Sequence, residues 1–255
     1  MDVVSFYIKG KMAHFRKYYS NSTALTYVLP PVTTIKGIIA GLLGYERDSY
    51  YDIFSNNRTK IAISIASPIK KIVQKMNLLK IERLNDLNGS HKDIRTQTNT
   101  EWVIPYEIRN GEISYRVILW HSDTEMVKKI EYSICNKKNY YLSKGISVAL
   151  GSAQCLGWIE DGKIIKCYKK ISDDKTIYVN SAIVKDIVES IDLSQITKIQ
   201  LGMDENITEF SNDRRLTINS KKELLFSLNA VPIPVKLIKG VEYIQVEGEN
   251  MVFIG

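Results

Sequence analysis

The feature that most constrains the fold is a short apolar segment directly behind Pro30-Pro31. Its large apolar residues recur with the i, i+3, i+4, i+7, i+8 spacing of a helix stripe that faces a core: Ile35, Ile38, Ile39, Leu42 and Leu43. Only small residues line the other side, namely Gly37, Ala40, Gly41 and Gly44. Since each glycine inside a helix costs roughly 1 kcal/mol relative to alanine, this smooth side predicts close contact with another backbone. We therefore expect a helix over residues 33–45 that packs on both sides, with Thr33 or Thr34 as its N-cap.

Positive charge is concentrated in the first two thirds of the chain. The 255 residues carry a formal net charge of +7, but residues 171–255 hold 9 Lys and Arg against 13 Asp and Glu, a net of −4. Residues 1–170 therefore hold 26 against 15, a net of +11. Such an excess predicts a polyanionic partner that is bound with salt-sensitive affinity. The alternative is a solvated lysine-rich surface, which the same counts describe equally well.

The composition excludes several classes of protein. No apolar run is long enough to span a membrane, and the N-terminus lacks the basic, apolar and cleavage regions of a signal peptide. The spacing of Cys135, Cys155 and Cys167 fits neither a zinc site nor a disulfide framework. The sequence also has no phosphate-binding loop, dinucleotide fingerprint or metal-ligating cluster of carboxylates. We therefore expect a cytoplasmic protein with no membrane partner, no metal and no cofactor.

The order of the predicted elements indicates an α+β fold with a ferredoxin-like first domain over residues 1–170. In chain order its strands and helices are expected at 2–9, 33–45, 60–67, 114–120, 123–136, 146–150 and 156–168. The last of these is expected to form a hairpin that turns at Asp161-Gly162. Between the second and third strands, residues 83–107 form a polar insertion that we expect to be irregular and that is longer than compact connections usually are.

Residues 171–255 are predicted to form a smaller β-rich domain. We expect a helix at Ser181–Ile191, followed by strands at 197–201, 214–218, 224–229 and 242–253. The two prolines of Val231–Val235 predict an edge strand or a connection there.

A basic and aromatic stretch follows the first strand. Phosphate-binding cations beside stackable rings suit single-stranded RNA, and the helix behind them offers free N–H groups to phosphate. The candidate RNA-binding residues of this region are Lys11, His14, Arg16, Lys17, Tyr27, Thr34 and Lys36. In the insertion, hydrogen-bonding side chains suit phosphate, sugar and base-edge contacts, and the candidates are Lys92, Arg95, Gln97 and Asn99. The alternative for the first region is a basic loop whose aromatic residues belong to the core. The alternative for the insertion is a polar surface loop.

No residue is assigned a catalytic role. Histidine titrates near neutrality and suits acid–base cleavage of RNA. The three histidines, His14, His91 and His121, lie in different segments and in no catalytic motif, and His121 is expected to cap or to lie at the surface. The alternative is a metal-independent endoribonuclease in which His14 or His91 is the acid or base, with Lys92 and one of Tyr45, Tyr50 and Tyr51.

Two blocks of sequence carry a resemblance to a known family. The pattern Gly10-x-x-Ala-x-Phe-Arg, then Pro30-Pro-x-Thr-x-x-x-Gly-x-x-Ala-x-x-x-Gly, resembles the start of the Cas-five family. These proteins are RAMP-superfamily subunits of the type I CRISPR complex Cascade, and the resemblance is nearest to type I-B. Arg95-Thr-Gln-Thr-Asn and Leu150-Gly-Ser-Ala-Gln-Cys are looser matches.

The resemblance implies a ferredoxin-like, RRM-like domain with a β-hairpin thumb inserted at about 83–107. Members of the family hold the five-prime handle of the crRNA, cap the filament of Cas-seven subunits and contact the large subunit that reads target DNA. Residues 11–17 and the start of the helix would then face the handle. One branch cleaves precursor RNA with a tyrosine, a lysine and a histidine, but this chain has only the reversed pair His91-Lys92. The resemblance therefore implies a non-catalytic RNA-binding subunit in antiviral defence.

Overall fold

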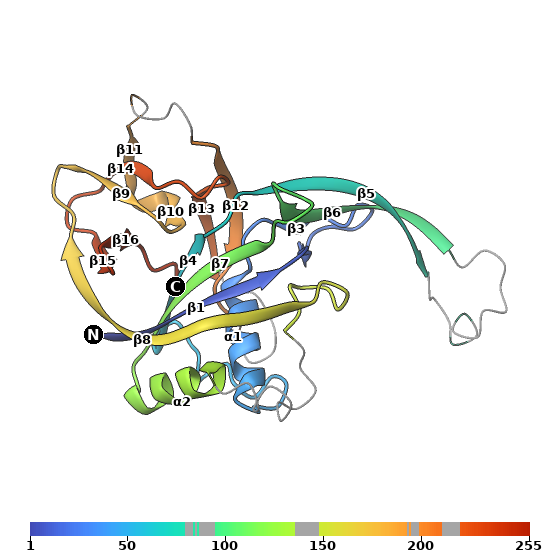
Figure 1. Ribbon diagram of the computed structural model, residues 1–255, viewed down its shortest axis with the longest axis horizontal. Helices are drawn as coiled ribbons and strands as arrows, with labels where there is room; N and C mark the ends of the chain where they lie inside the picture. The colour runs from blue at the N-terminus through green and yellow to red at the C-terminus, as the bar shows by residue number, and fades with distance from the viewer. Residues whose placement is uncertain are drawn as a thin grey trace.

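The centre of the molecule is a four-stranded antiparallel sheet with both helices on one face (Figure 1). The computed structural model describes residues 1–79, 84, 86, 95–135, 148–192, 194, 199–210 and 220–255. The central strands lie in the order β8 (Gly157–Ile171), β1 (Asp2–Gly10), β7 (Ile113–His121) and β4 (Thr59–Ile65). The helices are α1 (Val32–Leu42) and α2 (Thr124–Cys135). The predicted α+β fold is confirmed, with many strands and few helices.

Both faces of the central sheet are buried, which the alternation of side chains along β1 makes possible. Phe6 and Ile8 pack in the main core with the apolar stripes of α1 and α2. Val3 points the other way and packs with residues of β15 (Glu242–Val246) and β16 (Glu249–Met251). The guanidinium of Arg116, on β7, donates to Glu247 and Glu249 at 2.6 Å each and ties the β15–β16 turn to the sheet.

Helix α1 is buried on both sides, as predicted, but its start and its small side differ from the prediction. The helix begins at Val32 with Pro31 as its N-cap, whose side chain makes no capping hydrogen bond, so the predicted cap at Thr33 or Thr34 is wrong. A methyl group on Gly37 would meet the Tyr50 hydroxyl at 3.0 Å, which is a side chain and not a backbone. At the other end Gly44 has a φ of 79° and closes a Schellman motif with Tyr45 N–H donating to the Ala40 carbonyl.

Strand β8 is one continuous strand, so the predicted hairpin at Asp161-Gly162 is wrong. Its pairing with β1 shifts register between Ser5 and Tyr7, where Asp161 and Gly162 lie opposite Phe6 alone. Asp161 and Gly162 therefore form a β-bulge, with Asp161 at a φ of 54°. The strand then runs on to pair with β15. The four central strands are therefore part of one nine-stranded sheet, in the order β11-β14-β9-β16-β15-β8-β1-β7-β4.

The C-terminal part contains only short helical turns among its described residues. The predicted helix at Ser181–Ile191 is wrong, because Ile183 pairs with Leu225 and Val188 with Leu237 across strands. The elements here are β9 (Thr176–Val179), β10 (Ile183–Val184), the turn η3 (Lys185–Ile187), β11 (Val188–Ile191), β12 (Leu201–Ile207), β13 (Lys221–Ser227) and β14 (Ile233–Leu237). A separate three-stranded sheet has the order β10-β13-β12.

Some predictions for this part fail, and others fall outside the described residues. Strand β14 lies between β11 and β9, so the predicted edge or connection at Val231–Val235 is wrong. The pairing with β11 stops at Val235, next to Pro234, whose missing N–H is therefore tolerated. The predicted strand 214–218 and the first residues of 146–150 and of 197–201 are not among the described residues. The described end of 146–150 holds only an isolated bridge at Ala149, and the strand expected at 197–201 begins only at Leu201.

A long antiparallel hairpin leaves the central sheet between β4 and β7 and extends far from the body of the molecule (Figure 1). Its strands are β5 (Ile69–Leu79) and β6 (Arg95–Pro105). The predicted irregular structure of 83–107 is therefore wrong for residues 95–105. No helix among the described residues combines the length and apolar character needed to cross a membrane.

Candidate nucleic-acid interface

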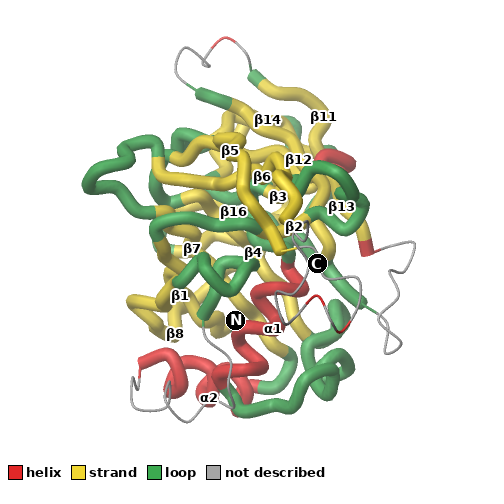
Figure 2. Tube along the Cα trace, turned by 90° about the vertical axis from the view of Figure 1, so that its right-hand side faces the viewer, coloured by secondary structure: helices red, strands yellow, loops and turns green. Residues whose placement is uncertain are grey.

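The segment between β1 and α1, residues 11–31, lies along the base of the β5–β6 hairpin, and we call it the N-terminal loop. It includes β2 (Phe15–Arg16) and β3 (Thr26–Tyr27), which Figure 2 shows beside β5 and β6. Ala13 exchanges two backbone hydrogen bonds of 2.9 Å with Val103, and Ala24 N–H donates to the Asn99 carbonyl at 2.8 Å. The loop therefore pairs with the edge of β6 that β5 leaves open.

A second segment holds the loop from its other side. His14 N–H donates to the Leu150 carbonyl at 3.0 Å, and His14 forms a parallel bridge with Gly151. Gly10 approaches the same segment so closely that a methyl group on it would lie 2.5 Å from Leu150 Cδ1. The sequence blocks Gly10–Arg16 and Leu150–Cys155 are thus neighbours in space.

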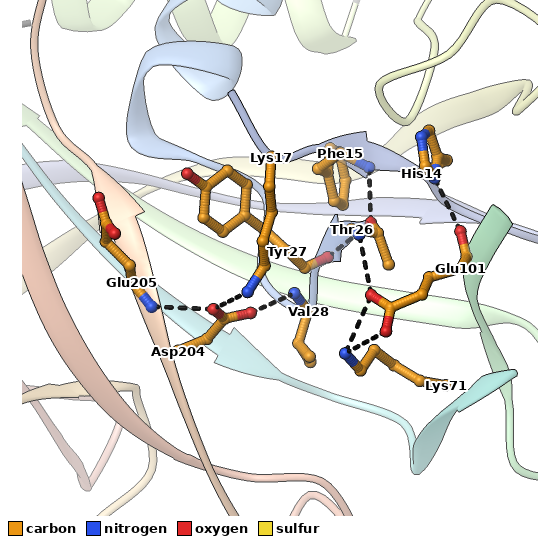
Figure 3. A network of polar contacts seen from close by, with 10 residues as sticks. All are labelled: His14, Phe15, Lys17, Thr26, Tyr27, Val28, Lys71, Glu101, Asp204 and Glu205. Carbon is orange, nitrogen blue, oxygen red and sulfur yellow. Dashed lines mark hydrogen bonds and ion pairs between the residues drawn. The ribbon is translucent and has the colours of Figure 1, made fainter. Parts of the chain in front are cut away.

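Glu101 of β6 fixes the middle of the loop (Figure 3). Its carboxylate accepts from the Thr26 N–H at 3.0 Å and from Lys71 Nζ at 3.1 and 3.2 Å. Its backbone carbonyl lies 2.7 Å from His14 Nδ1, and since a carbonyl only accepts, that nitrogen donates. These contacts tie the middle of the loop to β5 and β6.

Strand β12 binds the other end of the loop through every second residue, as the period of a strand allows. Asp204 accepts from Lys17 Nζ at 2.5 Å and from Val28 N–H at 3.3 Å (Figure 3). Asn206 accepts from Val32 N–H at 3.0 Å and donates to the Pro30 carbonyl at 3.2 Å. The first N–H of α1 is therefore bonded to a side chain of this chain.

The predicted site residues fall into three groups. Lys11, Arg16, Gln97 and Asn99 are exposed, and the first two donate to the carbonyls of Gly111 and Ser20 at 3.1 and 3.2 Å. The buried or half-buried residues are His14, Lys17, Tyr27, Thr34 and Lys36. Lys92 lies outside the described residues, as does His91, and of Arg95 only the backbone is described.

Lys17 is an ion pair partner and not a free cation. Its side chain is 12% exposed and that of Asp204 11%. Burial alone lowers the pKa of the ammonium, and the contact with Asp204 reverses this, so that the pKa is raised. The ammonium also lies 5.2 Å from the centroid of the Tyr27 ring.

Lys36 is buried at the centre of α1 and is 4% exposed. Its Nζ donates to Asn56 Oδ1 at 2.7 Å and to the Thr208 carbonyl at 3.0 Å. Burial lowers the pKa of the ammonium to about 8, although Glu209 acts in the opposite direction. The cavity beside it, of about 10 Å³, borders Tyr50 and Tyr51 and has room for about one water molecule, not for a nucleotide.

This buried lysine predicts that the protein becomes more stable at alkaline pH. Its folded pKa of about 8 lies below its usual value of 10.5, so the unfolded chain binds more protons between these values and the free energy of unfolding rises with pH. From about pH 7 to about pH 9.5 the gain is on the order of 2 kcal/mol. Urea unfolding at both pH values measures it. Lys36→Met should lack this gain, and parallel pH profiles of the two proteins would contradict the prediction.

The remaining candidates for acid–base chemistry have structural partners. His121, 2% exposed, accepts from Asp123 N–H at 3.0 Å through Nδ1, and its Nε2 lies 3.0 Å from the Ile53 carbonyl. It caps a turn, as predicted. His14 is 5% exposed, and its ring centroid lies 5.3 Å from that of Trp102 at an interplanar angle of 51°. The described residues contain no group of three or more His, Cys, Asp or Glu that could hold a metal ion.

Several cations near the loop were not identified from the sequence. Lys71 and Lys75 lie exposed on β5, and Lys221 lies over the ring of Tyr18 at 4.3 Å. The β-branched residues Ile72 and Val73 favour a strand at β5. The sequence shows no link between Lys221 and a tyrosine about two hundred residues earlier.

Comparisons with known proteins give matches at the level of structure. No protein-family model and no curated protein matches the sequence. A CRISPR protein from Archaeoglobus fulgidus aligns with a TM-score of 0.57 and 15% identity, over 98% of this chain and 98% of its own. A chain titled CRISPR RNA-guided surveillance complex aligns with a TM-score of 0.53 and 10% identity, over 90% of this chain and 91% of its own. This chain therefore shares its fold with both proteins.

Proposed function

We propose that this chain is a non-catalytic RNA-binding subunit of a type I CRISPR Cascade complex that acts in antiviral defence. In this role it holds the five-prime handle of the crRNA, caps the filament of Cas-seven subunits, and contacts the large subunit and through it target DNA. The observation that carries the proposal is the agreement in fold, over at least 90% of both chains, with a CRISPR protein and a CRISPR surveillance-complex chain.

The topology supports a RAMP-type domain of this kind. The chain order β1-α1-β4-β7-α2-β8 is the β-α-β-β-α-β order of a ferredoxin-like domain, which we assign to residues 1–170. The β5–β6 hairpin stands between the second and third strands of this order, and we assign the thumb to it. Its first strand begins at Ile69, well before the expected start at about residue 83. Residues 171–255 form the smaller β-rich domain. On the sequence blocks of residues 10–44 we place the complex in type I-B or a related system.

The proposed handle-binding surface consists of side chains that stay exposed on the N-terminal loop and along the outer half of the β5–β6 hairpin. These are Lys11, Arg16, Lys75, Gln97 and Asn99. Lys17 and Lys36, which are bonded inside the protein, hold the loop and the helix in place for them.

Charge reversal tests this surface. Lys11→Glu/Arg16→Glu is expected to weaken binding to single-stranded RNA with the CRISPR repeat sequence by about tenfold or more at low salt, because two phosphate contacts become repulsive. The slope of log affinity against log salt concentration should fall by about 1.4, or about 0.7 per lost contact. Fluorescence anisotropy titrations of the full chain measure both quantities.

A matched double variant controls for net charge. Lys129→Glu/Lys175→Glu changes the same total charge at exposed positions on α2 and beyond β8, away from the hairpin. It should bind RNA nearly as well as the native chain. Equal losses in both double variants would contradict the assigned surface, and cleavage of the RNA in the presence of a chelator would contradict a non-catalytic role.

A further inference from the structure

Two neighbouring tyrosines stand half exposed at the turn of the N-terminal loop. Tyr18 and Tyr19 are 49% and 47% exposed, although aromatic side chains of this size are mostly buried in folded proteins. Their ring centroids are 5.0 Å apart with an interplanar angle of 89°. The pair therefore presents π surface to solvent from a segment that the rest of the protein holds in place.

Cations border both rings. Lys221 Nζ lies 4.3 Å from the centroid of Tyr18 and also donates to its hydroxyl, while Lys17 Nζ lies 5.8 Å from the centroid of Tyr19. Lys17 is neutralised by Asp204, but the nearest carboxylate oxygen to Lys221 Nζ is Glu205 Oε1 at 3.8 Å. Lys221 is therefore the cation of the pair that retains the capacity to contact a phosphate.

Two polar atoms near the tyrosine pair are buried without a hydrogen bond in the described part of the chain, although one of them, Glu205 Oε1, lies 3.8 Å from Lys221 Nζ. The hydroxyl of Tyr27, a residue that is 1% exposed, and Glu205 Oε1 are buried without a hydrogen bond among the described residues. Burial, followed by the charge of Glu205, raises the pKa of Tyr27, so its hydroxyl remains a donor. Figure 3 shows this hydroxyl on the side of the loop where Glu205 lies. Both atoms are buried, so they lie beneath the exposed surface of the tyrosine pair and are not part of it.

We propose that Tyr18 and Tyr19 stack with an unpaired nucleobase of bound RNA, and that Lys221 contacts the adjoining phosphate. Exposed rings interleaved with cations are the arrangement by which proteins hold single-stranded nucleic acid. The site rests on the proposed function and extends it by assigning one nucleobase to three residues. One of the three, Lys221, comes from the acidic C-terminal part of the chain. A protein partner on the same rings is the competing occupant.

RNA with and without bases tests the stacking directly. The full chain is titrated with a short fluorescent single-stranded RNA and with an abasic analogue of the same length. Tyr18→Ala/Tyr19→Ala should weaken binding of the RNA by about tenfold or more, since stacking of one base contributes about 1 to 3 kcal/mol. The same variant should leave the affinity for the abasic analogue and the salt dependence unchanged.

Two further variants separate the contribution of the aromatic rings from that of the tyrosine hydroxyls and from the loss of any exposed tyrosine. Tyr18→Phe/Tyr19→Phe keeps both rings and should keep the affinity. Tyr168→Ala removes a tyrosine that is 65% exposed on β8 and should change nothing. If native chain binds the RNA but the alanine variant binds it equally well, or loses affinity for both ligands alike, the stacking site is refuted and a protein contact is favoured. If native chain binds neither ligand, the proposed function itself is refuted.

Discussion

Gly151→Ala is expected to destabilise the protein by about 3 to 4 kcal/mol, which is a large part of the stability of an ordinary domain. Gly151 has a φ of 89°, a conformation that costs a residue with a side chain of order 1 to 3 kcal/mol. In addition, its new methyl group would lie only 2.0 Å from the His14 carbonyl oxygen. The backbone of the N-terminal loop would have to move, so RNA binding should fall together with the free energy of unfolding. Urea unfolding and RNA titration measure the two effects.

A second glycine separates strain from contact. Gly240 has nearly the same φ, 87°, but nothing lies within 4 Å of a methyl group built on it. Gly240→Ala should therefore cost only about 1 kcal/mol and leave RNA binding unchanged. Equal destabilisation by the two substitutions would show that the contact between Gly151 and His14 does not hold the loop.

Asp204→Ala is expected to cost about 3 kcal/mol. The substitution leaves the ammonium of Lys17 unpaired at a site where its side chain is only 12% exposed, and it removes the acceptor of the Val28 N–H. Breaking a buried ion pair by removing one partner typically costs about 3 to 5 kcal/mol, because the other charge stays buried. The free energy of unfolding in urea is the measurement.

An exposed ion pair on the neighbouring strand provides the control. Lys185 and Glu223 are 2.6 Å apart but their side chains are 53% and 56% exposed, so Glu223→Ala should cost under about 1 kcal/mol. Adding Lys17→Met to Asp204→Ala should restore part of the lost stability, because no buried charge then remains unpaired. If the double variant is less stable than Asp204→Ala alone, the unpaired ammonium of Lys17 is not the cause of the lost stability.

Regular elements with a clear local pattern could be predicted from the sequence. The strand predicted at 2–9 is β1, and the strand predicted at 114–120 is β7. The apolar stripe from Ile35 is the buried side of α1. In each case neighbouring residues along the chain carry the whole signal, because the spacing of apolar side chains reflects the period of the element itself.

Elements whose form depends on distant pairing could not be predicted in this way. Asp161-Gly162 is a common turn sequence, yet β1 supplies one long partner and converts it into a bulge. Residues 181–191 have helical spacing but find strand partners in β13 and β14. Tertiary contacts override such local preferences because they bury more apolar surface than a lone surface helix would.

For the candidate site, residue types along the chain were enough to mark a loop of cations and aromatic rings between the first strand and a helix with a buried stripe. Which of these residues remain at the surface depends on the folded chain. Asp204, 187 residues after Lys17 in the chain, neutralises that lysine, whereas Lys221 from the same part of the chain joins the exposed tyrosines. The physical reason is that a side chain's type sets its chemistry, while burial and pairing, which decide whether that chemistry is available, depend on residues that only folding brings near.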